Sequence, residues 1–479
     1  MRVLEHLEPS RVFYYFEELC AIPHGSGHTK AISDYCVRFA REHGLVCRQD
    51  AADNIIIVKE AAPGCEAAPT VILQGHLDMV CEKEAGCDRD MEKEGPALAV
   101  EDGWVHAVGT TLGGDDGIAV AMALAILEAG DLTHPRLEAV FTSGEEVGMT
   151  GAAVLDTSSL RGRLLLNLDS EDEGIFIVSC AGGVVAECHL PVRRETVTAE
   201  TFTVTVGGLQ GGHSGTEIGK GRGMANQLMG RVLCALQERT SVGLVSVNGG
   251  LKDNAITLLS TAVLTADEEI LRGTVEEMDA AFRAEYRIAD PGVYVKWTKH
   301  ASAPAEVMTA ADTARAVCLL TCMPEGVEAM SREIPGLVQT SLNLGILQTS
   351  RDEVTAAFSI RSSVATQKEM LRQRLACQMA LLGGSVTCCG DYPAWEYCPD
   401  SRLRQLMTEV FTRQYGYAPK VEAMHAGVEC GLLSARMEGL DCVSYGPELL
   451  EIHTPRERMN VASVERTWRL TLEVLRRLS

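Results

Sequence analysis

Hydrophobic positions along the first 190 residues follow two alternating patterns. Apolar residues three or four apart predict amphipathic helices, and short runs of consecutive apolar residues predict buried strands. The predicted helices are residues 12–22, 30–43, 117–129 and 151–155. The predicted strands are residues 55–59, 70–74, 137–142, 164–168 and 175–179. Short apolar strands interleaved with helices predict an α/β domain, a mixed sheet with helices on both faces.

The pattern changes after residue 182, where strand-like and helix-like segments suggest a different class of domain. The predicted strands are residues 201–206, 255–265, 292–297, 341–348, 353–360 and 385–388. The predicted helices are residues 224–238, 268–286, 310–323 and 367–382. This order favours an α+β domain built from two βαββ-like units in tandem. The α/β alternation resumes at residue 392, so we predict one α/β domain, residues 1–186 and 392–479, interrupted by an inserted α+β domain, residues 187–391.

Length, composition and charge exclude several classes of function. The chain has 479 residues, 46% of them apolar, which is enough for the cores of two or three domains. Its net charge of −23 repels a phosphate backbone, so we expect no nucleic-acid partner. The most apolar stretch, residues 118–127, is too short to cross a membrane, and the N-terminus lacks the apolar core of a secretory signal. Seventeen cysteines without paired short spacings favour a reducing compartment, so we expect a cytoplasmic protein that binds no membrane.

Side chains that can bind metal follow several predicted strands. Ligand sites in open α/β sheets lie beyond the carboxyl ends of the strands. Imidazole or carboxylate groups stand there or at the start of the alanine-rich helix: His76, Asp78, Asp115, Glu145, Glu146 and Asp169. Any one of them alone is more often a structural histidine or part of a solvated loop, but their occurrence at successive element ends favours a shared site. The glycines before Asp115 lack the Gly-Lys-Ser/Thr ending of a phosphate-binding loop.

These residue types suit zinc, cobalt or manganese. A histidine near the end of the chain, His453, can complete a second set of ligands. We predict that His76, Asp115 and Asp169 hold one ion, and that Asp115, Glu146 and His453 hold the other. Asp115 then bridges two divalent ions per chain. We expect Zn²⁺, with Co²⁺ or Mn²⁺ as alternatives, and a water shared by both ions that is open to substrate.

The adjacent residues Glu145 and Glu146 are expected to have different roles, because successive residues leaving a strand point in different directions. Glu146 binds metal in this prediction. Glu145 is the general base, which takes a proton from the bridging water and passes it to the leaving amine. Asp78 is predicted to accept the second ring N–H of His76 and so to fix its tautomer.

The chain resembles the co-catalytic zinc metallopeptidases of the aminoacylase and carboxypeptidase type, and within them the aminoacyl-histidine dipeptidase (peptidase D, cytosolic nonspecific dipeptidase) branch. The resemblance covers nearly the whole chain. It rests on residues 74–80 (QGHLDMV), 111–117 (TLGGDDG), 141–151 (FTSGEEVGMTG), 166–169 (LNLD), 211–215 (GGHSG), 424–431 (MHAGVECG) and 453–455 (HTP).

The resemblance implies metal-dependent hydrolysis of dipeptides, of the Xaa-His type and including β-alanyl-histidine, by a metal-bridging hydroxide. It implies the same metal ligands, with Asp78 and Glu145 catalytic, and a cis peptide bond between Asp115 and Asp116. It also implies that the inserted domain is a lid, whose residue His213 polarises the scissile carbonyl oxygen.

Four further residues are candidates for substrate binding under the same resemblance. Asn254 joins His213 in the lid, and Arg361 binds the terminal carboxylate of the dipeptide unless it is an ordinary surface arginine. His425 and Glu429 line the amino-terminal subsite or have structural roles. Residues 257–259 read Thr-Leu-Leu where relatives commonly read Pro-Arg-Glu, a departure that bears on substrate specificity and not on hydrolysis.

Other functions remain open at this stage. An N-acyl amino acid deacylase or a tripeptide aminopeptidase would use the same metal core, and a non-catalytic peptide-binding protein could share the fold. The expected partner is a small peptide. The long inserted domain either forms a homodimer or takes the place of a partner chain.

Overall fold

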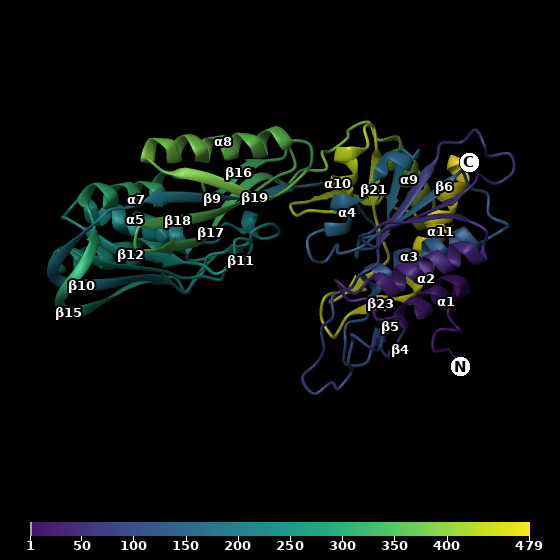
Figure 1. Ribbon diagram of the computed structural model, residues 1–479, viewed down its shortest axis with the longest axis horizontal. Helices are drawn as coiled ribbons and strands as arrows, with labels where there is room; N and C mark the ends of the chain where they lie inside the picture. Colours follow the sequence, from purple (N-terminus) through teal and green to yellow (C-terminus); the bar gives the residue numbers. More distant parts are fainter. Residues whose placement is uncertain (1) are drawn as a thin grey trace. The chain divides into compact units, whose positions relative to one another are not determined.

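The chain folds into two compact units, and the computed structural model describes residues 2–479 (Figure 1). The first, here called the α/β unit, contains residues 2–179, 397–423 and 428–479. The second, called the inserted unit, contains residues 180–396 and 424–427. The return of residues 424–427 to the inserted unit is not apparent from any sequence pattern. The domain limits expected from the sequence, after residues 186 and 391, stay predictions.

The α/β unit is built on an eight-stranded mixed sheet. In sheet order its strands are β1 (Val46–Gln49), β2 (Ile55–Lys59), β6 (Leu137–Thr142), β3 (Val71–His76), β7 (Leu164–Asn167), β21 (Asp441–Ser444), β8 (Ile175–Cys180) and β20 (Lys420–Met424). The four central strands β6, β3, β7 and β21 are parallel, whereas β1, β2 and β8 run antiparallel to a neighbour. The parallel strands bring their carboxyl ends to one edge of the sheet, where the predicted site residues follow.

Helices cover this sheet. They are α1 (Ser10–Cys20), α2 (Lys30–Glu42), α3 (Gly114–Glu128), α4 (Thr150–Val154), α9 (Arg402–Tyr415), α10 (Glu429–Arg436) and α11 (Val461–Leu478). Every residue of β3 and β6 is buried, so both faces of the sheet are covered there, which confirms the predicted α/β class. Helix α3 packs on β3 and is buried on all sides from Gly117 to Leu127, as its alanine-rich apolar sequence requires. Among the described residues, no helix is long and apolar enough to span a membrane.

A separate four-stranded sheet carries one of the predicted ligands. Its order is β22 (Leu449–Leu450), β23 (Arg458–Asn460), β5 (Trp104–Ala107) and β4 (Leu98–Glu101). Strands β22 and β23 pair antiparallel and enclose residues 451–457, so His453 lies on a hairpin loop and not at the end of a main-sheet strand. The sequence pattern did not predict these strands, because they are only two to four residues long.

The inserted unit contains a nine-stranded sheet, so the predicted α+β class holds. In order its strands are β15 (Tyr294–Met308), β10 (Arg194–Gly207), β14 (Ser260–Thr265), β12 (Gly243–Gly249), β17 (Val338–Thr349), β18 (Glu353–Ser362), β9 (Gly182–Pro191) and β19 (Ser385–Tyr392), with β16 (Gly326–Met330) on β17. Its helices are α5 (Ala225–Gln237), α6 (Glu268–Glu285), α7 (Ala310–Cys322) and α8 (Ala365–Leu382).

Two βαββαβ halves supply eight of the nine strands of this sheet, and β16 adds the ninth. One is β10-α5-β12-β14-α6-β15, and the other is β9-α7-β17-β18-α8-β19. The first half lies between β9 and α7 of the second, so the expectation of two units in tandem is wrong: one is nested inside the other. The halves join where β12 pairs with β17. The long strand predicted at residues 255–265 is instead two short ones, β13 (Ala255–Ile256) and β14. Residues 257–259 belong to neither strand, and β13 pairs with β11 (Gly212–His213) outside the nine-stranded sheet.

One face of the nine-stranded sheet is covered by helices. Buried and partly exposed residues alternate along β14 and the first part of β18, as expected of an antiparallel sheet with a single packed face. The core beneath the helices includes the fully buried Phe202, Phe282 and Phe358. Helix α8 packs along β9, β18 and β19 (Figure 1).

Candidate metal centre and active site

The first predicted ligand set lies at the carboxyl ends of β3 and β7. His76 is the last residue of β3, and its side chain is buried. Its Nε2 atom lies 3.0 Å from Oδ1 of Asp115 and 3.6 Å from Oδ1 of Asp169. Asp115 comes from the start of α3 and Asp169 from the loop after β7. The fold therefore brings together three residues that are far apart in the sequence.

The second predicted ligand set shares Asp115 with the first. Nε2 of His453 lies 3.1 Å from Oδ2 of Asp115 and 2.9 Å from Oε1 of Glu146. The two oxygens of Asp115 thus face different histidines, which is the arrangement a bridging carboxylate needs. Donor atoms in a tetrahedral zinc site with bonds of about 2.0–2.1 Å lie roughly 3.3 Å apart. The imidazole and carboxylate donors of both sets have separations that fit divalent cations.

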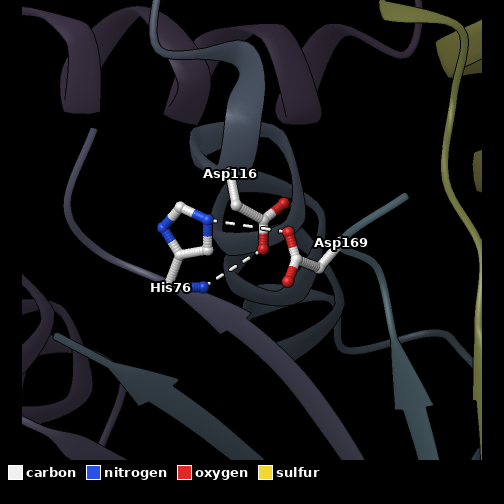
Figure 2. A group of neighbouring side chains, drawn as sticks. All are labelled: His76, Asp116 and Asp169. Carbon is white, nitrogen blue, oxygen red and sulfur yellow. Dashed lines mark hydrogen bonds and ion pairs between the residues drawn. The ribbon is translucent and has the colours of Figure 1, made fainter. Parts of the chain in front are cut away.

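Asp116 is a neighbour that the sequence analysis did not assign. Its carboxylate is buried, and Oδ2 accepts the backbone N–H of His76 at 3.1 Å (Figure 2). His76, Asp116 and Asp169 also form one of the groups whose donor atoms lie within 4.8 Å of one another, and Asp115, Glu146 and His453 form another. The peptide bond between Asp115 and Asp116 is cis, as the resemblance implied. The only sequence signal for Asp116 is its place beside Asp115.

Burial, together with repulsion between carboxylates, raises the pKa values of acidic side chains in this cluster. Burial raises the pKa of Glu145 to about 9, and the charge of Asp169 acts in the same direction. Burial also raises the pKa of Asp116 well above its usual value, with Asp169 again contributing. Although burial opposes it, hydrogen bonds with Asp115 and Asp169 raise the pKa of His76. A cluster with this much buried negative charge favours cations.

Asp78 makes contacts other than the one predicted. His76 Nδ1 lies 2.8 Å from the backbone carbonyl oxygen of Asp78 and 3.7 Å from its carboxylate, so the carbonyl is the closer acceptor of the ring N–H. The carboxylate instead accepts the backbone N–H of Glu145 at 3.0 Å and the hydroxyl of Ser26 at 2.8 Å. Asp78 therefore fixes the loop that carries Glu145, and its main chain fixes the His76 ring.

Glu429 is the first residue of α10 and is completely buried. Its Oε2 atom accepts hydrogen bonds from Thr142 and from the side-chain amide of Gln74, both at 2.6 Å. Among residues 2–479, its Oε1 atom has no hydrogen-bond partner. Burial raises the pKa of Glu429 to about 7. These contacts fit the structural role that the sequence left open and leave one acceptor atom available.

Three predicted residues of the inserted unit, Arg361, His425 and His213, form a second cluster, in which Arg361 carries the positive charge. Arg361 lies within β18 and is only 8% exposed, so it is not a surface arginine, and its Nη1 donates to the hydroxyl of Tyr392 at 3.0 Å. His425 Nε2 lies 2.7 Å from the hydroxyl of Ser341. Burial lowers the pKa of His425 to about 3, and the charges of Arg361 and His213 act in the same direction.

His213 is held in one tautomer. Its Nδ1 atom accepts the backbone N–H groups of Gly215 and Thr216, both at 3.3 Å, so in the neutral ring the proton is on Nε2. Burial lowers the pKa of His213, with the charge of Arg361 contributing, which favours that neutral form. The exposed Asn254 is adjacent, because its carbonyl oxygen accepts the N–H of Ser214 at 2.9 Å. His213 therefore offers an N–H donor on a segment that is hydrogen-bonded to the main chain of Asn254.

Comparison with known proteins decides the family. The family model described as "Peptidase family M20/M25/M40" matches residues 72–477. The chain belongs to this family. It is thus a metallopeptidase, which agrees with the resemblance noted in the sequence and with the paired donor sets.

Two relatives match this chain over nearly its full length. The chain is 35% identical to the cytosol non-specific dipeptidase of Escherichia coli (strain K12), over 100% of this chain and 99% of that protein. It is 33% identical to the aminoacylhistidine dipeptidase of Vibrio alginolyticus, whose crystal structure matches with a TM-score of 0.94 over 99% of this chain and 98% of that one. An aminopeptidase from Bacillus cereus, 14% identical with a TM-score of 0.57, shares the fold.

We expect Gly75→Ala to disturb the metal centre. A Cβ atom there would lie 2.5 Å from Oδ2 of Asp116 and 2.7 Å from Cβ of Ala119, so the Asp116 carboxylate must leave its position beside the His76 N–H. Overpacking of this kind costs about 1–3 kcal/mol. Metal content and the thermal midpoint should both fall. The control is Gly130→Ala, since a Cβ there meets nothing within 4 Å. Unchanged metal content in the Gly75 variant would contradict the expectation.

Proposed function

We propose that this metallopeptidase hydrolyses dipeptides, with Xaa-His dipeptides and β-alanyl-histidine among its substrates. The observation that carries the proposal is the pair of donor sets joined by Asp115, whose two oxygens face His76 and His453. The two full-length relatives named above, a non-specific dipeptidase and an aminoacylhistidine dipeptidase, support the substrate class. The term "cytosol" in the first name supports a cytoplasmic location.

In this proposal the ions are held as the sequence predicted. His76, Asp115 and Asp169 hold one, and Asp115, Glu146 and His453 hold the other. The donor set suits zinc, with cobalt or manganese as alternatives. Two such ions supply Lewis-acid catalysis and activate water at neutral pH.

Glu145 is the proposed general base. Its carboxyl is partly buried in the acidic cluster, and Asp78 holds its backbone N–H at 3.0 Å. Bound divalent ions would add positive charge to the cluster and lower the pKa of neighbouring carboxyls. Glu145 would then be ionised in the metal-loaded enzyme. It takes a proton from the attacking water and delivers it to the leaving amine.

The substrate's charged ends and carbonyl have proposed partners of matching chemistry. Arg361 binds the terminal carboxylate, since its buried Nε atom has no hydrogen-bond partner among residues 2–479 and remains a donor. His213 donates from Nε2 to the scissile carbonyl oxygen as charge develops there, and Asn254 assists it. Glu429 and His425 stay predicted residues of the amino-terminal subsite. Within residues 2–479, Oε1 of Glu429 and Nδ1 of His425 have no hydrogen-bond partner.

Assembly into a homodimer through the inserted unit stays a prediction. Strand β15 is a terminal strand of the nine-stranded sheet and could pair with a second copy. The inserted unit already contains two halves of the same βαββαβ order. The alternative is therefore that one half takes the place of a partner chain. Light scattering distinguishes a dimer from a monomer.

Hydrolysis of a panel of four substrates before and after chelation tests the proposed function. We expect alanyl-histidine and β-alanyl-histidine to be cleaved, chelation to abolish cleavage, and Zn²⁺, Co²⁺ or Mn²⁺ to restore it. Faster cleavage of an N-acetyl amino acid would identify a deacylase instead, and faster cleavage of a tripeptide would identify an aminopeptidase. Binding without cleavage of any of the four would identify a peptide-binding protein.

Glu145→Gln should retain the metal ions and lose turnover, because the amide cannot accept the water's proton. General-base catalysis typically contributes about 10²–10⁴-fold, so kcat should fall by that factor. Elemental analysis of the same sample checks that metal is still bound. Glu276→Gln, at an exposed position of α6, is the control and should keep wild-type kcat. A Glu145 variant with substantial residual turnover would mean that another group is the base.

Arg361→Met should raise KM for dipeptides by about 10–100-fold, since hydrogen bonds to charged groups contribute about 1.5–3 kcal/mol. The same variant should bind a dipeptide amide about as well as the wild type does, because the amide lacks the carboxylate charge. This comparison within one variant separates recognition of the carboxylate from any loss of stability. Equal increases in KM for acid and amide would remove Arg361 from the carboxylate subsite.

A further inference from the structure

A buried carboxylate outside the predicted ligand sets lies next to the metal centre. Glu457 is 2% exposed and follows His453 by four residues. Its Oε2 atom accepts the backbone N–H groups of Leu112 at 2.8 Å and Gly113 at 3.1 Å. Its Oε1 atom accepts those of Gly114 at 2.7 Å and Asp115 at 3.3 Å. One carboxylate thus takes four consecutive backbone donors, and the last of them belongs to the predicted bridging ligand.

These four donors need an external acceptor because the start of α3 is irregular. Asp115 and Asp116 have non-helical backbone angles, and Gly113 has φ of 75°. The N–H groups at a helix start have no acceptor within the helix, and a negative charge there is favourable. Gly114 leaves the room that the contact requires, since a Cβ atom at this position would lie 3.2 Å from Oε1 of Glu457.

The main chain of Glu457 belongs to the loop that carries His453. The backbone N–H of Glu457 donates to the carbonyl oxygen of Thr454 at 3.0 Å, and the Thr454 hydroxyl donates to the carbonyl oxygen of Glu451 at 2.7 Å. Glu451 and His453 both have positive φ, 55° and 60°, which is unfavourable for residues other than glycine. A loop in this conformation persists only when surrounding contacts hold it.

We propose that Glu457 is a positioning residue that sets the distance between Asp115 and His453. Through its side chain it holds the segment of Asp115, and through its main chain it holds the loop of His453. The inference rests on the proposed metal centre and deepens it: Glu457 governs the ion bound by Asp115, Glu146 and His453. The other ion keeps His76 and Asp169 as ligands. These two residues lie outside residues 112–115, whose backbone N–H groups the Glu457 side chain accepts.

The test is titration of metal-free protein with Zn²⁺ in competition with a chromophoric chelator. Glu457→Gln keeps the size of the side chain but replaces one acceptor oxygen with an NH₂ group that faces backbone donors. Loss of a partner that orients metal ligands typically costs about 10–100-fold in metal affinity. We expect one of two zinc equivalents to weaken by this factor while the other changes much less. Turnover should recover in part as the Zn²⁺ concentration is raised.

Glu138→Gln is the matched control. Glu138 is also a fully buried carboxylate of the α/β unit, and it accepts the N–H groups of Arg161 and Gly162, both at 3.0 Å. It lies near the start of β6, whereas the metal centre follows the ends of the strands. The control variant should lose stability and keep both zinc affinities.

Three outcomes would overturn the inference about Glu457: wild-type affinity for both equivalents in the Glu457 variant, equal weakening of both equivalents, or the same weakening in the Glu138 control. If Glu457→Gln does not fold, Glu457→Asp replaces it, because the shorter side chain keeps its charge but cannot reach all four donors; wild-type zinc affinities in that variant would also overturn the inference. Failure of the wild-type chain to bind two zinc equivalents would contradict the proposed metal centre itself, a result that the wild-type titration reveals separately.

Discussion

Repulsion among carboxylates in a partly buried site is the constraint around which the α/β unit is organised. Asp115, Asp116, Glu145, Glu146 and Asp169 gather around two imidazoles, and burial with mutual repulsion raises the pKa of Asp116 and Glu145. Such a cluster is stable when cations neutralise it. The hydrogen bonds that surround it hold the acids in place against their repulsion, as Asp78 does for the loop of Glu145.

Backbone groups, more than additional cationic side chains, hold the residues of this site in place. The His76 N–H donates to Asp116, the His76 ring contacts the Asp78 carbonyl oxygen, and four successive N–H groups surround Glu457. Backbone donors carry no net charge, so they orient the carboxylates without occupying the place of an ion. Glycines stand at positions 75 and 114, where a Cβ atom would come within 2.5 Å of Oδ2 of Asp116 and 3.2 Å of Oε1 of Glu457, respectively.

Patterns that depend on one element could be predicted from the sequence, whereas contacts between distant elements could not. The continuous apolar runs of β3 and β6 predicted the class of the sheet. The residues at or after the ends of these runs predicted His76, Glu145 and Glu146 as site residues. Short strands of two to four residues carry no periodicity, so the hairpin that presents His453 was not predicted even though His453 itself was. The nested halves of the inserted unit were misread as tandem, because strand order in a sheet is set by pairing and leaves no trace in local hydrophobic spacing. Glu457 was missed for a related reason: its partners are backbone groups more than 340 residues earlier in the chain.

The two units differ in the sign of the charge they offer, and this difference bears on the kind of substrate. The α/β unit concentrates carboxylates, while Arg361 lies in the inserted unit with His213 and His425, whose pKa values its charge helps to lower. A small peptide has an ammonium group at one end and a carboxylate at the other. If these groups act as proposed, a substrate with both charged ends is favoured. Dipeptides and tripeptides have both ends, whereas an N-acyl amino acid lacks the ammonium group.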